Sequence, residues 1–84
     1  MKCFYIIGLR LDNRVDHAAK LQEVLTNNGC SIKVRLGLHD VADNYCSNDG
    51  LIILQPCGEK EQVLELVGEL DKIDGVTAKL MDLN

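Results

Sequence analysis

The sequence lacks a surplus of positive charge, and this absence narrows the choice of partners. It contains 9 Lys and Arg residues against 13 Asp and Glu residues, for a net charge of −4. Proteins that bind DNA or RNA directly usually carry basic residues clustered on one face, because they must neutralise the phosphate backbone. We therefore expect no direct nucleic-acid partner.

Long apolar runs are also missing. A membrane-spanning helix needs about 18 or more consecutive apolar residues, whereas the longest runs here are short strand cores such as residues 51–54. Residues 1–9 resemble a signal peptide in part, but Arg10 and Asp12 follow at once and there is no small-residue cleavage site. We expect a cytoplasmic protein that does not bind a membrane.

No pair of cysteines has the C-x-x-C spacing of many metal-binding and redox motifs. Four cysteines in a short secreted chain would indicate a disulfide framework, but the expected cytoplasmic location favours reduced thiols. The sequence therefore predicts free thiols, some buried as small apolar groups and some in loops, at Cys3, Cys30, Cys46 and Cys57.

Motifs for catalysis are absent as well. Gly8 and Gly37 lie singly inside predicted strands, so no glycine-rich loop is available to bind phosphate. No Ser-His-Asp arrangement can be proposed from the spacing, and His39 with Cys46 is the sole Cys/His pair close in sequence. We expect the protein not to be an enzyme.

Two helices are predicted from apolar residues at helical spacing. The first lies between the capping residues Asp12-Asn13 and the stop signal Asn28-Gly29. The second covers residues 58–73 and ends at Asp74-Gly75. The apolar positions of the first helix are Val15, Ala18, Leu21, Val24 and Leu25. Those of the second helix are Val63, Leu66, Leu70 and Ile73.

Four strands are predicted around these helices, over residues 2–11, 32–39, 51–54 and 76–83. The second strand shows strict apolar–polar alternation, which is typical of a half-solvated edge strand, and Pro56 ends the pairing of the third. The order predicts one α+β domain over residues 1–84 with a ferredoxin-like βαββαβ fold. Its four-stranded antiparallel sheet carries both helices on one face.

Helices on one face leave the other face of the sheet uncovered. The first and third strands carry apolar residues on both of their faces, so one apolar set must point away from the helices. An exposed apolar face of several hundred Å² marks a partner site, and another copy of the chain is the default partner. We therefore expect a homo-oligomer, a dimer or tetramer, with an interface formed by Phe4, Ile6, Ile52 and Leu54.

The polar stretch over residues 39–50 is predicted to be a long loop. Its His39, Asp40 and Cys46 combine imidazole, carboxylate and thiolate, which suit a transition metal. The spacing of His39 and Cys46 matches no rigid ligand pattern, so a subunit interface would have to complete the shell. The alternatives are a solvated acidic loop that caps turns and a small organic ligand bound beneath it.

A second candidate site is cationic. Lys33 and Arg35 share one face of the second strand, while Arg10 ends the first strand and Arg14 begins the first helix. Backbone N–H groups at that helix start would help these residues bind a carboxylate or phosphate. The alternative is an ordinary charged exterior, in which Lys33 and Arg35 protect an edge strand from uncontrolled pairing.

The segments IKVRLGLH at residues 32–39 and GLIIL at residues 50–54 carry a resemblance to a known family. Set in a βαββαβ chain of this length, they resemble the ACT-like domains of the iron-only hydrogenase system regulators. The resemblance covers essentially the whole chain and implies a ferredoxin-like fold, oligomerisation and a regulatory role. Related domains bind small ligands, or in the nickel-responsive repressor a transition metal, between subunits. Residues 12–15, DNRV, lack the proline and glycine typical of amino-acid-binding ACT domains.

Three functional hypotheses follow. The first is a homo-oligomeric regulatory or ligand-sensing domain with its site near residues 39–50 and the subunit interface. The second is a transition-metal or redox sensor that uses His39 and Cys46. The third is a protein–protein interaction module that binds no ligand.

Overall fold

The computed structural model describes residues 2–12, 14–42 and 45–84, and its elements follow the predicted βαββαβ order. A short 3-10 helix, η1, joins the first helix to the second strand. The elements are β1 (Tyr5–Leu11), α1 (Arg14–Asn27), η1 (Gly29–Ser31), β2 (Ile32–Ala42), β3 (Tyr45–Pro56), α2 (Lys60–Asp71) and β4 (Val76–Asp82).

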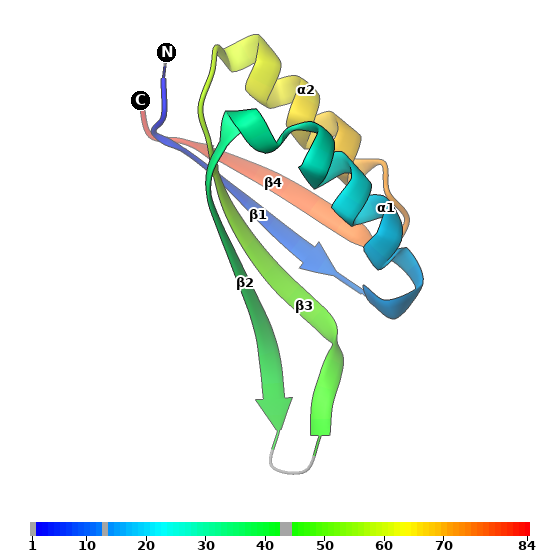
Figure 1. The fold of residues 1–84 in the computed structure, drawn as a ribbon. Helices are drawn as coiled ribbons and strands as arrows, with labels where there is room; N and C mark the ends of the chain where they lie inside the picture. Colours follow the sequence, from blue (N-terminus) through cyan, green and yellow to red (C-terminus); the bar gives the residue numbers. More distant parts are fainter. Residues whose placement is uncertain (1, 13, 43–44) are drawn as a thin grey trace.

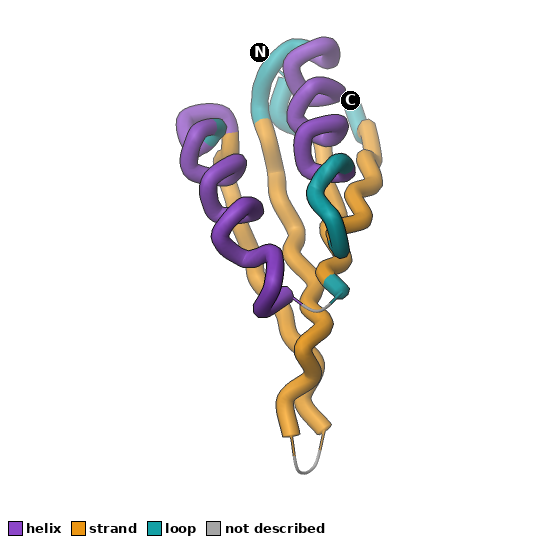
Figure 2. The backbone as a smooth tube through the Cα atoms, turned by 90° about the vertical axis from the view of Figure 1, so that its right-hand side faces the viewer, coloured by secondary structure: helices purple, strands orange, loops and turns teal. Residues whose placement is uncertain are grey.

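The strands form one four-stranded sheet in the order β2-β3-β1-β4, with every neighbouring pair antiparallel. β1 and β3 are therefore central, and β2 and β4 form the edges. Both helices pack on the same face of the sheet (Figures 1 and 2). The predicted α+β class, with an antiparallel sheet and two helices on one face, is confirmed.

The core lies between this face and the helices. In β1 every second side chain is buried, from Tyr5 to Leu11, because successive side chains of a strand point to opposite faces. The helices contribute residues at intervals of three or four positions, which place them on one stripe. These helical core residues are Leu21, Val24, Leu25, Val63, Leu66 and Leu70.

The helix ends are fixed by side chains. At the end of α1 the carbonyl of Val24 accepts two hydrogen bonds from Asn28, one from its backbone N–H at 3.2 Å and one from Nδ2 at 2.9 Å. At the start of α2, Glu59 and Gln62 form a capping box, in which the Glu59 N–H donates to Gln62 Oε1 at 3.1 Å. Gly58 suits this position because its φ of +152 is one that other residues rarely adopt, and a Cβ there would also lie 2.8 Å from the oxygen that forms the capping box.

β2 and β3 extend well beyond the other strands, so the prediction of a long loop over residues 39–50 is wrong. His39 pairs with Gly50, and Val41 pairs with Cys46. β1 stops pairing with β3 at Leu11 and Gly50, so residues 39–42 and 45–49 form a two-stranded ribbon outside the main sheet, hereafter the arm (Figure 1). The strands of the arm could not be predicted from the sequence, because strand prediction relies on apolar alternation. A ribbon that covers no core needs no such alternation, and the residues of the arm are largely polar.

Cys3 and Cys57 form a disulfide, so the prediction of four reduced thiols is wrong for this pair. Their Cα atoms lie 4.2 Å apart although 54 positions separate them in the sequence. The segment before β1 runs antiparallel to the segment after β3, with a bridge between Lys2 and Gly58. This pairing between distant segments is a tertiary feature for which the cysteine spacing gives no signal.

Candidate functional site

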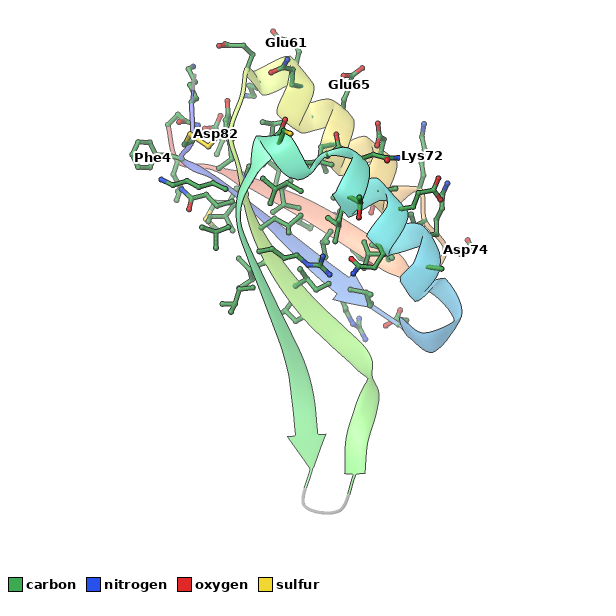
Figure 3. The ribbon with its side chains drawn as sticks, in the orientation of Figure 1. Phe4, Glu61, Glu65, Lys72, Asp74 and Asp82 are labelled. Carbon is green, nitrogen blue, oxygen red and sulfur yellow. A yellow bond between two sulfur atoms is a disulfide. The ribbon has the colours of Figure 1, made fainter. Side chains whose placement is uncertain are left out.

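The face of the sheet opposite the helices is largely apolar. In β1 and the residue before it, the side chains that alternate with the buried set are Phe4, Ile6, Gly8 and Arg10. Figure 3 shows Phe4 projecting from the sheet on the side away from both helices. Strand pairing places apolar residues of the other strands on this same face, hereafter the open face. The apolar residues of the open face and its glycine are Phe4, Ile6, Gly8, Val34, Leu36, Leu51, Ile53, Met81 and Leu83. The same register places the polar residues Arg10, Gln55, Thr77 and Lys79 on this face.

Six of these side chains are large, apolar and exposed. Their exposed fractions are 67% for Phe4, 61% for Leu83, 56% for Met81, 50% for Leu36, 45% for Val34 and 43% for Leu51. They amount to about 600 Å² of apolar surface, at the upper end of the largest patch on a typical monomer. Apolar side chains exposed singly need no explanation, but a contiguous set on one sheet face marks an interaction site.

On β3 the structure corrects the predicted interface. Leu54 is fully buried and Ile52 packs against the core, so neither belongs to the open face. The register explains this, because Leu54 and Ile52 lie opposite the buried Ile7 and Leu9 of β1. Phe4 and Ile6 lie on the open face as expected, and their β3 neighbours there are Leu51 and Ile53. The alternation within each strand does not show which of its residues share a face with which residues of the neighbouring strand.

On β2 an irregularity in the register separates Ile32 from Val34. Ile32 packs against the core, yet Val34 and Leu36 lie on the open face, and Arg35 lies opposite Leu54 on the helix side. An extra residue in one strand reverses the faces of all side chains that follow it. Here Lys33 is the extra residue, because Ile32 pairs with Pro56 and Val34 pairs with Gln55. The expected face of β2 shared by Lys33 and Arg35 is therefore not formed.

The predicted cationic site is not assembled by the described residues. Arg10 lies on the open face and forms an exposed ion pair with Asp12 at 3.4 Å. Arg35 lies on the helix side of an edge strand, with Leu25 and Thr26 of α1 around the same cleft of about 210 Å³. β3 separates the strands that carry Arg10 and Arg35. The side chain of Arg14 lies outside the described part of the structure.

The predicted metal ligands lie on the arm. Cys46 pairs with Val41, and His39 pairs with Gly50, so the two candidate ligands are not directly opposite each other. The side chains of His39, Asp40 and Cys46 lie outside the described part of the structure. Among the side chains that the structure describes, no group of three or more His, Cys, Asp or Glu residues is arranged to hold a metal ion. The metal hypothesis therefore stays a prediction.

The clefts between the helices are small. One of about 200 Å³ lies between the end of α1 and the start of α2, and one of about 320 Å³ lies between the two helices further along. Pockets for small organic ligands usually measure roughly 300–1,000 Å³. The smaller cleft is polar and is lined in part by Asn28, Ser31, Cys57, Gln62, Glu65 and Glu69.

The C-terminal residues fix the rim of the open face. The Leu83 N–H donates to the carbonyl of Phe4 at 2.8 Å. Asp82 accepts hydrogen bonds from the backbone N–H of Asn84 at 3.0 Å and from Asn84 Nδ2 at 2.8 Å. These two bonds, and then the neighbouring Lys60 ammonium at 3.5 Å, lower the pKa of Asp82 from its ordinary value.

Comparison with known proteins shows a close likeness in structure over the whole chain. No family model matches the sequence, and no curated protein matches it. The chain is similar in structure to the uncharacterized protein TM1266 from Thermotoga maritima, with a TM-score of 0.84 and 27% sequence identity over 100% of both chains. This likeness supports the α+β fold over the whole length of the chain.

No helix within residues 2–12, 14–42 and 45–84 is long and apolar enough to cross a membrane.

Proposed function

We propose that this chain is a non-enzymatic regulatory domain that works as a homo-oligomer, with the open faces of two copies packed against each other. The observation that carries the proposal is the group of exposed apolar side chains on one face of the sheet. The patch of about 600 Å² approaches the roughly 800 Å² that each partner buries in a standard interface. The polar surroundings of the patch, such as Arg10, would complete the buried area.

A second copy suits this face for two reasons. An 84-residue chain buries a smaller fraction of its surface than a larger domain does, so covering its apolar face with a copy of itself adds core. Sheets also pack face to face at about 10 Å with their strands roughly aligned, and a two-fold axis lets one patch serve on both sides. The default assembly is a dimer, and a tetramer would use a further surface.

We propose that a small ligand binds between the copies and near the arm. The clefts of a single copy, at about 200 and 320 Å³, are at or below the usual size of a ligand pocket, which favours a site completed by a partner. The resemblance to ACT-like hydrogenase regulators agrees with such a site and with a cytoplasmic role. The small clefts are equally compatible with the third hypothesis, an interaction module that binds no ligand.

The test compares two leucines of equal exposure on opposite sides of the molecule. Leu36 on the open face is 50% exposed and Leu64 on α2 is 49% exposed. We expect Leu36→Glu to weaken self-association at least about tenfold, because a charge buried at an interface without a partner costs more than about 1.4 kcal/mol. We expect Leu64→Glu to leave association unchanged.

Sedimentation equilibrium of both variants and the unmodified chain measures this, with circular dichroism to verify folding. An equal loss of association in the two variants, or no loss in Leu36→Glu, would exclude the open face as the interface. If the interface holds, a change in melting temperature with a panel of metabolites separates the ligand-sensing domain from the module without a ligand.

A further inference from the structure

The disulfide between Cys3 and Cys57 lies where three segments meet: the residues before β1, the end of β3 at Pro56 and the start of α2 at Lys60. Both cysteines are partly exposed, and Cys57 also lines the cleft of about 200 Å³ at the start of α2. A soluble thiol can therefore approach the bond without unfolding of the domain.

The disulfide is the covalent anchor of a weakly held segment. Neither Lys2 nor Phe4 is buried, so the segment over residues 2–4 contributes little to the core. Its other attachments include three hydrogen bonds of 2.8 Å, which are donated to the carbonyls of residues 2, 3 and 4. The donors are the N–H of Gly58, Nε2 of Gln55 and the N–H of Leu83, respectively.

The surrounding structure allows the bond to break and form again. The hydrophobic core cluster contains neither cysteine, so breaking the bond removes no side chain from it. The Lys2–Gly58 bridge directly beside the disulfide holds the two segments together, so after reduction the thiols stay close enough to be oxidised again. In the proposed cytoplasmic location, disulfides are usually transient and serve catalysis or redox sensing.

We propose that Cys3 and Cys57 form a reversible redox site whose substrate is a cellular dithiol, and that its state controls association through Phe4. A thiolate of the reduced dithiol attacks one sulfur of the protein disulfide, forming a mixed disulfide and releasing the other cysteine as a thiolate that takes up a proton. The second thiol of the reductant then resolves the mixed disulfide. Both protein cysteines end reduced, and the dithiol ends as a disulfide.

Phe4 connects this chemistry to the open face. It is the residue next to Cys3 and, at 67% exposed, one of the most exposed large apolar residues of the proposed interface. With the disulfide intact, the segment is held at both ends, and Phe4 is presented beside Leu83. After reduction the Lys2–Gly58 bridge still keeps the segment near Cys57, but the residues around Cys3 gain part of their freedom, and ordering them again on association opposes binding. This effect on association rests on the proposed function. The redox site does not depend on the proposed interface, and takes from the proposal only the cytoplasmic location.

The first part of the test uses the chain with Cys30→Ser and Cys46→Ser, so that Cys3 and Cys57 are the only cysteines. The folded protein is equilibrated in glutathione buffers from fully reducing to fully oxidising, trapped with iodoacetamide and weighed by mass spectrometry. As the buffer becomes more oxidising, we expect the number of alkylated cysteines to change from two to none in a single reversible step. The circular dichroism spectrum should stay unchanged. A bond that never forms, or that yields to reductant only when the protein unfolds, would overturn the redox site.

The second part measures the dissociation constant of the assembly in both redox states by sedimentation equilibrium. We expect the oxidised protein to associate about tenfold more tightly than the reduced protein, and Phe4→Ala to remove most of this difference. Equal association in the two states would overturn the control through Phe4. If both states are monomeric, the proposed function and this control fail together, while the alkylation result still decides the redox site.

Discussion

Gly8 occupies the middle of β1 on the open face, flanked by Ile53 of β3 and Lys79 of β4. No other atom lies within 4 Å of the position that a Cβ would take there. A glycine inside a strand weakens the strand, and it often marks a place where another backbone approaches closely. A larger side chain in place of Gly8 should therefore stabilise the single chain but weaken the proposed assembly.

We predict that Gly8→Val stabilises the single folded chain by about 0.5–1 kcal/mol, because valine removes the entropic cost of glycine in a strand. The same change should weaken self-association about tenfold, because extra volume in a close-packed interface costs about 1–3 kcal/mol. Gly37 on β2 is the matched control, since its Cβ position is also free but lies on the helix side, opposite Ile52.

Urea unfolding of dilute protein measures the stability, and sedimentation equilibrium measures the association. Gly37→Val should raise the stability without changing the association. If Gly8→Val associates as tightly as the unmodified chain, the two sheets do not approach each other at β1.

At the scale of elements, the order and most ends could be predicted, because each carried both periodicity and a stop signal. Which side chains of neighbouring strands share a face could not be predicted. The prediction that Leu54 lies on the uncovered face is wrong, because the face that Leu54 occupies depends on its pairing with Ile7. In the same way, the faces that the β2 side chains occupy depend on the irregularity at Lys33. The disulfide also depends on pairing between distant segments, about which alternation within one strand contains no information. The arm pairs residues close in sequence, but its polar strands lack the apolar alternation that indicates a strand.

The ion pair between Lys60 of α2 and Asp82 of β4 links the start of a helix to the end of an edge strand. Because the pKa of Asp82 is lowered in the folded protein, its charged form is favoured by folding. The sign follows from linkage: this contribution is present above the pKa of the unfolded chain and is lost as the pH falls through the lower folded pKa.

We predict that Asn84→Ala raises the pKa of Asp82 only in part, because it removes the hydrogen bond from Nδ2 but keeps the backbone N–H of residue 84, which is the largest cause of the shift. Lys60→Ala should also raise this pKa only in part, because both hydrogen bonds from residue 84 remain. NMR titration of the side-chain carboxyl carbon of Asp82 in the two variants and the unmodified chain measures this. A return of the pKa of Asp82 to its ordinary value in Lys60→Ala would show that the ion pair, and not the C-terminal hydrogen bonds, controls this group.

At the scale of the whole molecule, the chain has one covered and one uncovered sheet face. The covered face is packed by α1 and α2 (Figure 2). The uncovered face presents apolar residues from all four strands. The arm adds to this asymmetry, and the molecule measures 44 × 22 × 18 Å as a result. A two-stranded ribbon is only marginally stable by itself in water, so the arm too would gain from contact with a second copy.

Native mass spectrometry of the untreated protein tests the central claim most directly, because it reports the number of copies and any bound mass together. We predict species at even multiples of the 9.3 kDa chain, beginning with the dimer, and a shift to the single chain in Leu36→Glu but not in Leu64→Glu. A single 9.3 kDa species at micromolar concentration would contradict the account, since the open face would then remain uncovered in solution.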